Sequence, residues 1–117
     1  MDSLSKLQLF FQTLGDVNRL RIIKFIDVNE CSVSEIVNGT GLSQPLVSHH
    51  LKSLRNINIL ETKRNGPFIY YKLKDKKLLD ALGLFLELVN SLNDVEIDTS
   101  FFCTPRWWKI YWNKKVK

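Results

Sequence analysis

The chain has 117 residues, of which 44% are hydrophobic and 25% are charged, and its formal net charge is +5. This length suits one domain, and this composition excludes a disordered or low-complexity chain. No apolar run reaches the roughly 18 residues that cross a bilayer, and the first residues lack the features of a signal peptide. We therefore expect a cytoplasmic protein without a membrane partner, whose two cysteines are free thiols.

Three short helices are expected in the first third of the chain. Residues 3–14 carry apolar side chains at helical spacing, and Asp16 is a suitable N-cap for a second helix. Ser32 followed by Glu35 forms a capping box, in which the serine hydroxyl and the carboxylate each accept a backbone N–H. This third helix should end within residues 38–41, where glycine permits the left-handed backbone of a tight stop.

A fourth helix is expected over residues 44–56, with Ser43 as its N-cap and Pro45 in the first turn, where a missing N–H costs little. Its apolar stripe consists of Val47, Leu51 and Leu54. Its other faces carry Gln44, Ser48, His49, Lys52 and Arg55. Two short helices joined by a glycine-containing turn, with polar residues on the second, match a helix-turn-helix.

A basic β-hairpin is expected directly after these helices. Residues 59–63 and 68–74 have strand composition, and the Asn-Gly between them is a strong hairpin signal. Residues 43–77 carry eight basic and two acidic side chains. Such a basic region is typical of nucleic-acid binding, so we expect a mainly α fold with a small β-hairpin wing, a winged helix-turn-helix.

The last expected helix spans residues 76–92, and its apolar stripe is wider than one small core needs. We interpret the excess as a partner face. Residues 1–93 would then form one DNA-binding and dimerisation domain, followed by an aromatic and basic extension over residues 94–117. The extension holds all three tryptophans, which we expect to cap the dimer core; a membrane interface or nucleic acid is the open alternative.

Three motifs stand out along the chain: LGDVNRLRIIKFI from Leu14, LSQPLVSHHLKSL from Leu42 and RNGPFIYYKL from Arg64. Together they resemble the pattern of the ArsR/SmtB family of bacterial and archaeal winged-helix repressors. Val17 stands where that family often has proline. The resemblance covers residues 4–93 and does not extend into the rest of the chain.

The resemblance implies a homodimer, paired through the first and last helices, that binds double-stranded DNA at an imperfect palindrome. It also implies a recognition helix in the major groove and wings on the flanking backbone. The DNA-binding residues expected by position are Ser43, Gln44, Ser48, His49, Lys52, Lys63 and Arg64. The polar residues of the helix would contact bases and phosphates, and the basic residues would contact phosphates. His50 is expected to be partly buried.

Many relatives in this family bind metal at one of two places, and both sets of ligands are missing from this sequence. When the C-x-C segment of the family is placed on residues 30–36, Ser32 and Ser34 take both thiolate positions, where hydroxyls are poor substitutes. The only histidines, His49 and His50, lie in the recognition helix, so the last helix offers no imidazole. We therefore expect no metal site and no cofactor.

Three interpretations remain open for Cys31 and Cys103. They resemble the cysteine pair that some family members oxidise as a thiol switch, although a disulfide requires Cα atoms within about 7 Å. Across a dimer, the same two thiols would make at most a weak metal site. Alternatively Cys31 is a packing residue, because cysteine is among the residues most often fully buried.

The sequence predicts a homodimeric, sequence-specific transcriptional regulator, a repressor with no small-molecule substrate. The alternative is a winged-helix interaction module whose C-terminal tail binds a protein partner or a membrane surface. An enzyme is not expected, because no trio of nucleophile, base and orienting group and no phosphate loop is visible.

Overall fold

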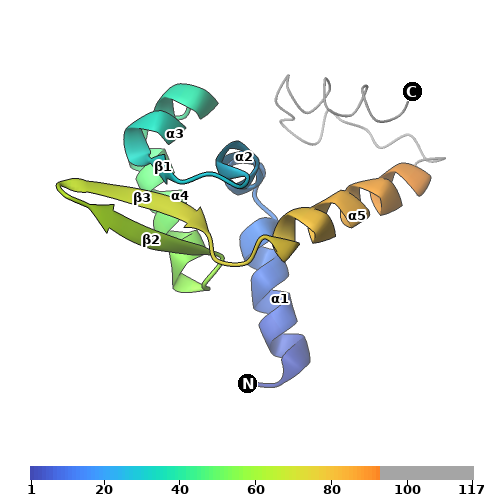
Figure 1. Cartoon of the computed structure of the whole chain (residues 1–117). Helices are drawn as coiled ribbons and strands as arrows, with labels where there is room; N and C mark the ends of the chain where they lie inside the picture. The colour runs from blue at the N-terminus through green and yellow to red at the C-terminus, as the bar shows by residue number, and fades with distance from the viewer. Residues whose placement is uncertain (93–117) are drawn as a thin grey trace. The chain divides into compact units, whose positions relative to one another are not determined.

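The computed structural model describes residues 1–92, which form a mainly α fold with a small antiparallel sheet (Figure 1). In chain order its elements are α1 (Ser3–Leu14), α2 (Val17–Ile26), β1 (Cys31–Ser32), α3 (Val33–Thr40), α4 (Gln44–Asn56), β2 (Leu60–Asn65), β3 (Phe68–Leu73) and α5 (Lys77–Ser91). They fall in two units, of which the second begins within α5 at Asp80. The predictions for Cys103 and for the aromatic and basic extension lie outside the described residues.

The helices begin where the local sequence signals predict. The Asp16 carboxylate accepts the Asn18 backbone N–H at 2.8 Å and so caps α2. The capping box of α3 is formed in both directions, because Ser32 and Glu35 each donate a backbone N–H to the other's side chain at 3.2 Å. Gly41 ends α3 in the left-handed region with φ of 74°, so the turn into α4 depends on a residue without a Cβ.

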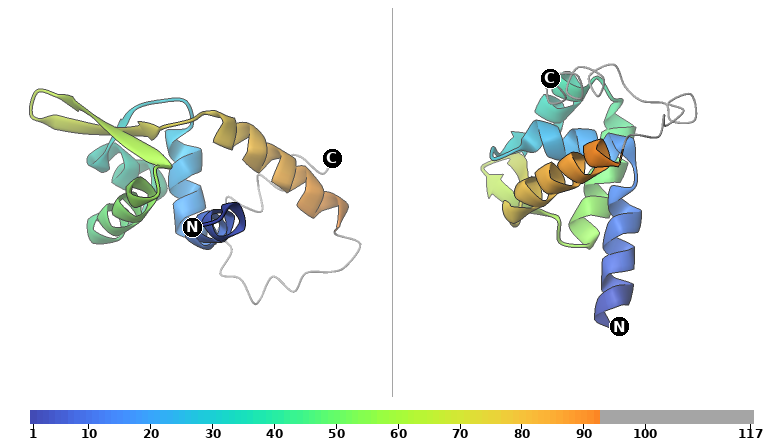
Figure 2. Two further views of the ribbon diagram at one scale, coloured as in Figure 1. Left: turned by 90° about the horizontal axis from the view of Figure 1, so that it is seen from below. Right: turned by 90° about the vertical axis from the view of Figure 1, so that its right-hand side faces the viewer.

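The sheet has three strands in the order β1-β3-β2, of which only the β2–β3 hairpin was predicted. The hairpin turns at Gly66, where φ is 63°, and it projects beyond the helices α3 and α4 (Figure 2). The third strand, β1, is two residues long and pairs Cys31 with Tyr71. A strand this short carries no alternating pattern, so its pairing is visible only in three dimensions.

The core of the first unit is built from the apolar faces of α2, α3, α4 and the base of the hairpin. The large, fully buried side chains are Ile22, Ile23, Ile26, Ile36, Val47, Leu51, Leu54 and Leu60. This core fixes the side of α4 that faces inward, and therefore the side that is left to solvent. Among the helices of residues 1–92, none has both the length and the apolarity that crossing a bilayer requires.

Two helices expose large apolar side chains. On α1, Leu4 is 76% exposed, and Leu7 and Leu9 are exposed as well. On α5, Leu84 and Leu88 are 67% and 52% exposed, and no residue of this helix is buried in the single described chain. The apolar excess that the sequence predicted for the last helix is therefore present.

Candidate nucleic-acid interface

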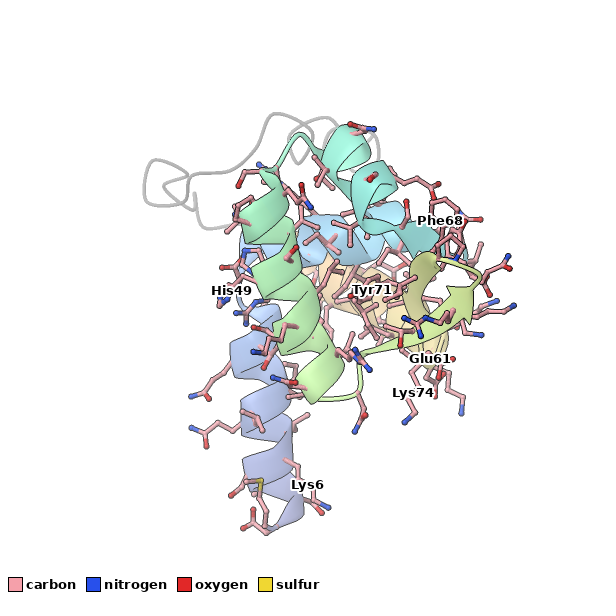
Figure 3. The ribbon with its side chains drawn as sticks, turned by 90° about the vertical axis from the view of Figure 1, so that its left-hand side faces the viewer. Lys6, His49, Glu61, Phe68, Tyr71 and Lys74 are labelled. Atoms are coloured by element: carbon pink, nitrogen blue, oxygen red, sulfur yellow. The ribbon has the colours of Figure 1, made fainter. Side chains whose placement is uncertain are left out.

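Helix α4 has one buried and one solvent-facing side. Its buried side chains are Val47, His50, Leu51 and Leu54. The polar residues that the sequence singled out on and before this helix are all exposed: Ser43, Gln44, Ser48, His49 and Lys52. Figure 3 shows His49 projecting outward from α4. The helix therefore presents a continuous polar surface that packing against the core leaves free.

The charge around this surface has one sign. No acidic residue occurs between Ile36 and Leu60, a stretch that includes the turn and all of α4. The first turn of α4 is also exposed, and Ser43 Oγ accepts only the Leu46 backbone N–H there, at 3.4 Å. The helix dipole adds partial positive charge at this helix start. An anionic partner is thus favoured along the whole exposed side of α4.

Lys63 and Arg64, which the sequence predicted to have the same role, lie in different environments on the wing. Cross-strand pairs join Lys63 to Tyr70 and Arg64 to Ile69, so the two cations lie on opposite faces of the hairpin. The Lys63 Nζ lies 3.5 Å from an Oε1 of Glu30, whereas Arg64 has no ion pair among the described residues. An exposed pair of this kind contributes little stability, so Lys63 can exchange Glu30 for another anion.

Glu30 also faces a second lysine on the same side of the hairpin. Lys72 Nζ lies 4.0 Å from Glu30 Oε1 and 3.4 Å from Glu61 Oε1. These residues, with Lys63, surround the base of the wing, where Figure 3 labels Glu61. The sequence did not single out Glu30, because its partners lie more than thirty positions away and no local motif indicates these contacts.

Behind the exposed side of α4, His50 is 4% exposed and takes part in a polar contact with α2. Its Nδ1 accepts the Nε–H of Arg19 at 3.0 Å. Burial, the largest cause, lowers the pKa of His50, and the Arg19 and His49 charges act in the same direction, while Asp16 opposes them. His50 was expected to be partly buried; the structure buries it, so its ring is not part of the exposed side of α4.

Cys31 lies in β1 opposite Tyr71 and is 5% exposed. Burial raises the pKa of the Cys31 thiol, and the nearby Glu35 carboxylate raises it further. The thiolate is the reactive form of cysteine, so this environment disfavours reaction. Within residues 1–92 no three His, Cys, Asp or Glu side chains gather closely enough to hold a metal ion. For the whole chain, the absence of a metal site stays a prediction.

Comparison with known proteins finds a matching family and several similar transcriptional regulators. Residues 16–62 match the family described as "Bacterial regulatory protein, arsR family". The chain is 34% identical over 76 residues to the Cadmium resistance transcriptional regulatory protein CadC of Listeria innocua, a match that covers 64% of each chain. It is 29% identical over 80 residues to the Transcriptional repressor SdpR of Bacillus subtilis, covering 68% of this chain and 89% of SdpR.

A solved structure has the same architecture. The homodimeric winged helix-turn-helix DNA-binding domain of Mb0332 from Mycobacterium bovis matches with a TM-score of 0.67 at 22% identity. The match covers 74% of this chain and 81% of that one. At this identity the likeness shows the fold, and the predicted winged helix-turn-helix is confirmed.

Proposed function

Because this chain belongs to the ArsR family of winged helix-turn-helix regulators, we propose that it is a homodimeric, sequence-specific DNA-binding protein that represses transcription. The observation that carries this proposal is the two-sided helix α4, with its core-facing side buried and its polar side free of acidic residues. The major groove admits an α-helix, and its phosphate borders attract a positive surface.

The polar residues of α4 divide into two roles. Gln44, in the exposed first turn, is proposed to read a base edge, because a glutamine amide pairs with N6 and N7 of adenine. Ser48 and His49 follow one turn later and are proposed to contact bases or phosphates. Lys52 and Ser43 are proposed to bind phosphates, contacts that position the helix without reading sequence.

The wing supplies further phosphate contacts in this proposal. Arg64 lies on the face of the hairpin that continues the core side, whereas Lys63 lies on the opposite face beside Glu30. Arg64 is therefore the stronger candidate for the DNA backbone. Lys63 would first have to leave Glu30, an exchange that a phosphate favours because the existing pair is exposed to solvent.

The dimer in this proposal uses the exposed apolar side chains of α1 and α5, such as Leu4 and Leu88. Soluble monomers seldom expose apolar surface of this extent, and a two-fold partner is the commonest way to cover it. The structural relative Mb0332 is itself described as homodimeric. Two copies of α4 related by a two-fold axis would read an imperfect palindrome with half-sites about one helical turn apart.

The environment of Cys31 favours a packing role over a thiol sensor, because the side chain is buried and its pKa is raised. DNA binding in excess reductant and after mild oxidation separates the two roles. Equal binding in both states supports packing. A reversible loss of binding that is absent in Cys31→Ser would instead support a thiol switch.

The test of DNA recognition begins with selection of bound duplexes from a random pool. Fluorescence anisotropy then compares the selected duplex with a scrambled one, and a salt titration checks for the steep weakening that counterion release produces. Gln44→Ala and His49→Ala should each lower the affinity ratio about tenfold, the value of one good base contact. Gln12→Ala, a matched change on the exposed side of α1, should leave the ratio unchanged.

A wild-type protein that binds both duplexes equally would contradict the proposal. In that case, flotation with anionic lipid vesicles would test the interaction-module alternative, in which the C-terminal tail carries the activity.

A further inference from the structure

We propose that Arg19 is a positioning residue for DNA recognition, which fixes the orientation of α4 through His50 and Ser53. The inference rests on the proposed function, since the face whose orientation it sets is the proposed DNA-reading face. Arg19 belongs to the motif that begins at Leu14, but the motif assigns it no role; the role proposed here follows from the contacts of its guanidinium group.

That guanidinium joins three helices. Arg19 Nε donates to His50 Nδ1 at 3.0 Å, Nη1 donates to the Thr13 carbonyl at 3.1 Å, and Nη2 donates to Ser53 Oγ at 3.4 Å. Thr13 belongs to the last turn of α1, so a single side chain of α2 ties α1 to α4. Ser53 Oγ in turn donates to the carbonyl of His49 at 3.2 Å, which continues the chain of hydrogen bonds to a proposed DNA contact.

The direction of these hydrogen bonds restricts His50 to one form. Arginine only donates, so His50 Nδ1 must be the unprotonated acceptor and the ring proton must sit on Nε2. Nε2 is buried and has no hydrogen-bond partner among the described residues; the nearest carboxylate oxygen, Asp16 Oδ1, is 3.9 Å away. The charged and titratable groups that face His50 are Asp16, which is the N-cap of α2, Arg19 of α2, and His49 of α4 itself.

Apolar packing sets which side of α4 faces inward, and directional hydrogen bonds can restrict the small rotations that remain. The side chains of Val47, Leu51 and Leu54 hold α4 against the core, but such contacts are non-directional. The Arg19 fork is planar and rigid, and it holds two positions on α4 that are three residues apart. A rotation of α4 would break both hydrogen bonds and would also displace His49, whose carbonyl is bound to Ser53.

The decisive variant is Arg19→Lys, which keeps the positive charge but replaces the planar fork with a single ammonium group. Its matched control is Arg21→Lys on the same helix, because the Arg21 Nε has no hydrogen-bond partner among the described residues. Circular dichroism first establishes a temperature at which both variants are folded. Anisotropy then gives the affinity ratio between the duplex selected by the wild-type protein and a scrambled duplex.

Arg19→Lys should lower this ratio roughly tenfold through weaker binding of the selected duplex, because a rotated helix loses about one base contact. Binding of the scrambled duplex should not change, since phosphate contacts tolerate a small rotation. Arg21→Lys should keep the wild-type ratio. A folded Arg19→Lys protein with the wild-type ratio overturns the inference, whereas a wild-type protein without discrimination overturns the proposed function.

A second pair of variants applies if Arg19→Lys fails to fold. His50→Leu removes the acceptor of the Arg19 Nε–H, while His50→Gln retains an amide oxygen that can accept it. Discrimination should fall in His50→Leu and be retained in His50→Gln. Equal ratios in these two variants, whether high or low, would show that the hydrogen bond does not position α4.

Discussion

At the scale of single residues, His50 and Cys31 are both buried, and burial disfavours the charged form of each. It lowers the pKa of His50 and raises the pKa of Cys31, so both side chains are neutral around pH 7. Burial of the two groups affects the protein at different pH, because histidine becomes charged by binding a proton and cysteine becomes charged by losing one. His50 becomes a cation in acid, whereas Cys31 becomes an anion in base.

Acidification should therefore destabilise the protein through His50. Its pKa lies below the ordinary value of 6.5, so the unfolded state binds more protons than the folded state in the interval beneath that value. The free energy of unfolding, from urea titrations, should fall as the pH drops from roughly 7 to 5. His50→Gln should remove part of this fall and His49→Gln, on the exposed side, should not; identical slopes in both variants would contradict the account of His50.

Cys31 should react slowly with alkylating reagents in the folded protein. The Cys103→Ser variant leaves Cys31 as the only thiol, so mass spectrometry can follow its reaction with iodoacetamide at pH 7.5. We expect a rate on the order of tenfold lower than in the same protein unfolded by urea, because the folded state shields the thiol and disfavours the thiolate. Equal rates in the two states would make Cys31 an accessible thiol and revive the sensor hypothesis.

At the scale of elements, α3 determines how α4 is presented. An eight-residue helix is too short to be stable alone, so α3 depends on its ends and on packing. The capping box satisfies its first turn, Gly41 terminates it, and Ile36 anchors it in the core. Because only Leu42 and Ser43 follow Gly41 before α4 begins, a frayed α3 would loosen the start of the recognition helix.

Ser32→Ala should lower the free energy of unfolding by about 1 kcal/mol, the usual value of an N-cap hydroxyl. Urea denaturation monitored by circular dichroism measures this change. Ser34→Ala, two positions into the same helix and exposed, is the matched control and should be close to neutral. If the two variants are equally stable, the Ser32 cap does not stabilise α3.

At the scale of the whole molecule, the exposed apolar side chains of α1 and α5 favour a partner that covers them. Leu4 and Leu84 are 76% and 67% exposed, and each is one of several exposed apolar side chains on its helix, a feature typical of interaction surfaces. A second copy of the chain fits the proposed function, because one recognition helix alone contacts too few base pairs for a specific operator. Dimerisation and DNA affinity should then change together.

Leu88→Lys should convert the dimer to a monomer, because it places a charge in the proposed interface where Leu88 is now 52% exposed. Sedimentation velocity measures the mass, and we expect affinity for the selected duplex to fall roughly a hundredfold as the second half-site is lost. Glu87→Lys introduces the same side chain at the neighbouring exposed position and should remain dimeric. A dimeric Leu88→Lys protein would remove this part of α5 from the interface.

Much of the fold could be predicted because its signals are local. Asp16, Ser32 and Ser43 cap helices through hydrogen bonds to residues two or three positions away, and Asn65-Gly66 forms its turn from its own backbone preferences. Periodicity likewise predicted the two-sided character of α4, because a helix that buries Val47 and Leu51 turns Ser48 and His49 toward solvent. For these features, residues within a few positions in the sequence determine the local structure.

The sequence by itself thus determined the helices, the hairpin and the polar surface of α4, since each depends on contacts within one turn or one pair of strands. Only the tertiary structure decided that β1 joins the sheet, that Lys63 meets Glu30 and that Arg19 holds His50. These pairs are separated by about thirty to forty positions in the sequence. Whether the two residues of such a pair meet in space depends on how α2, α4 and the wing pack together, and no local sequence pattern indicates that packing.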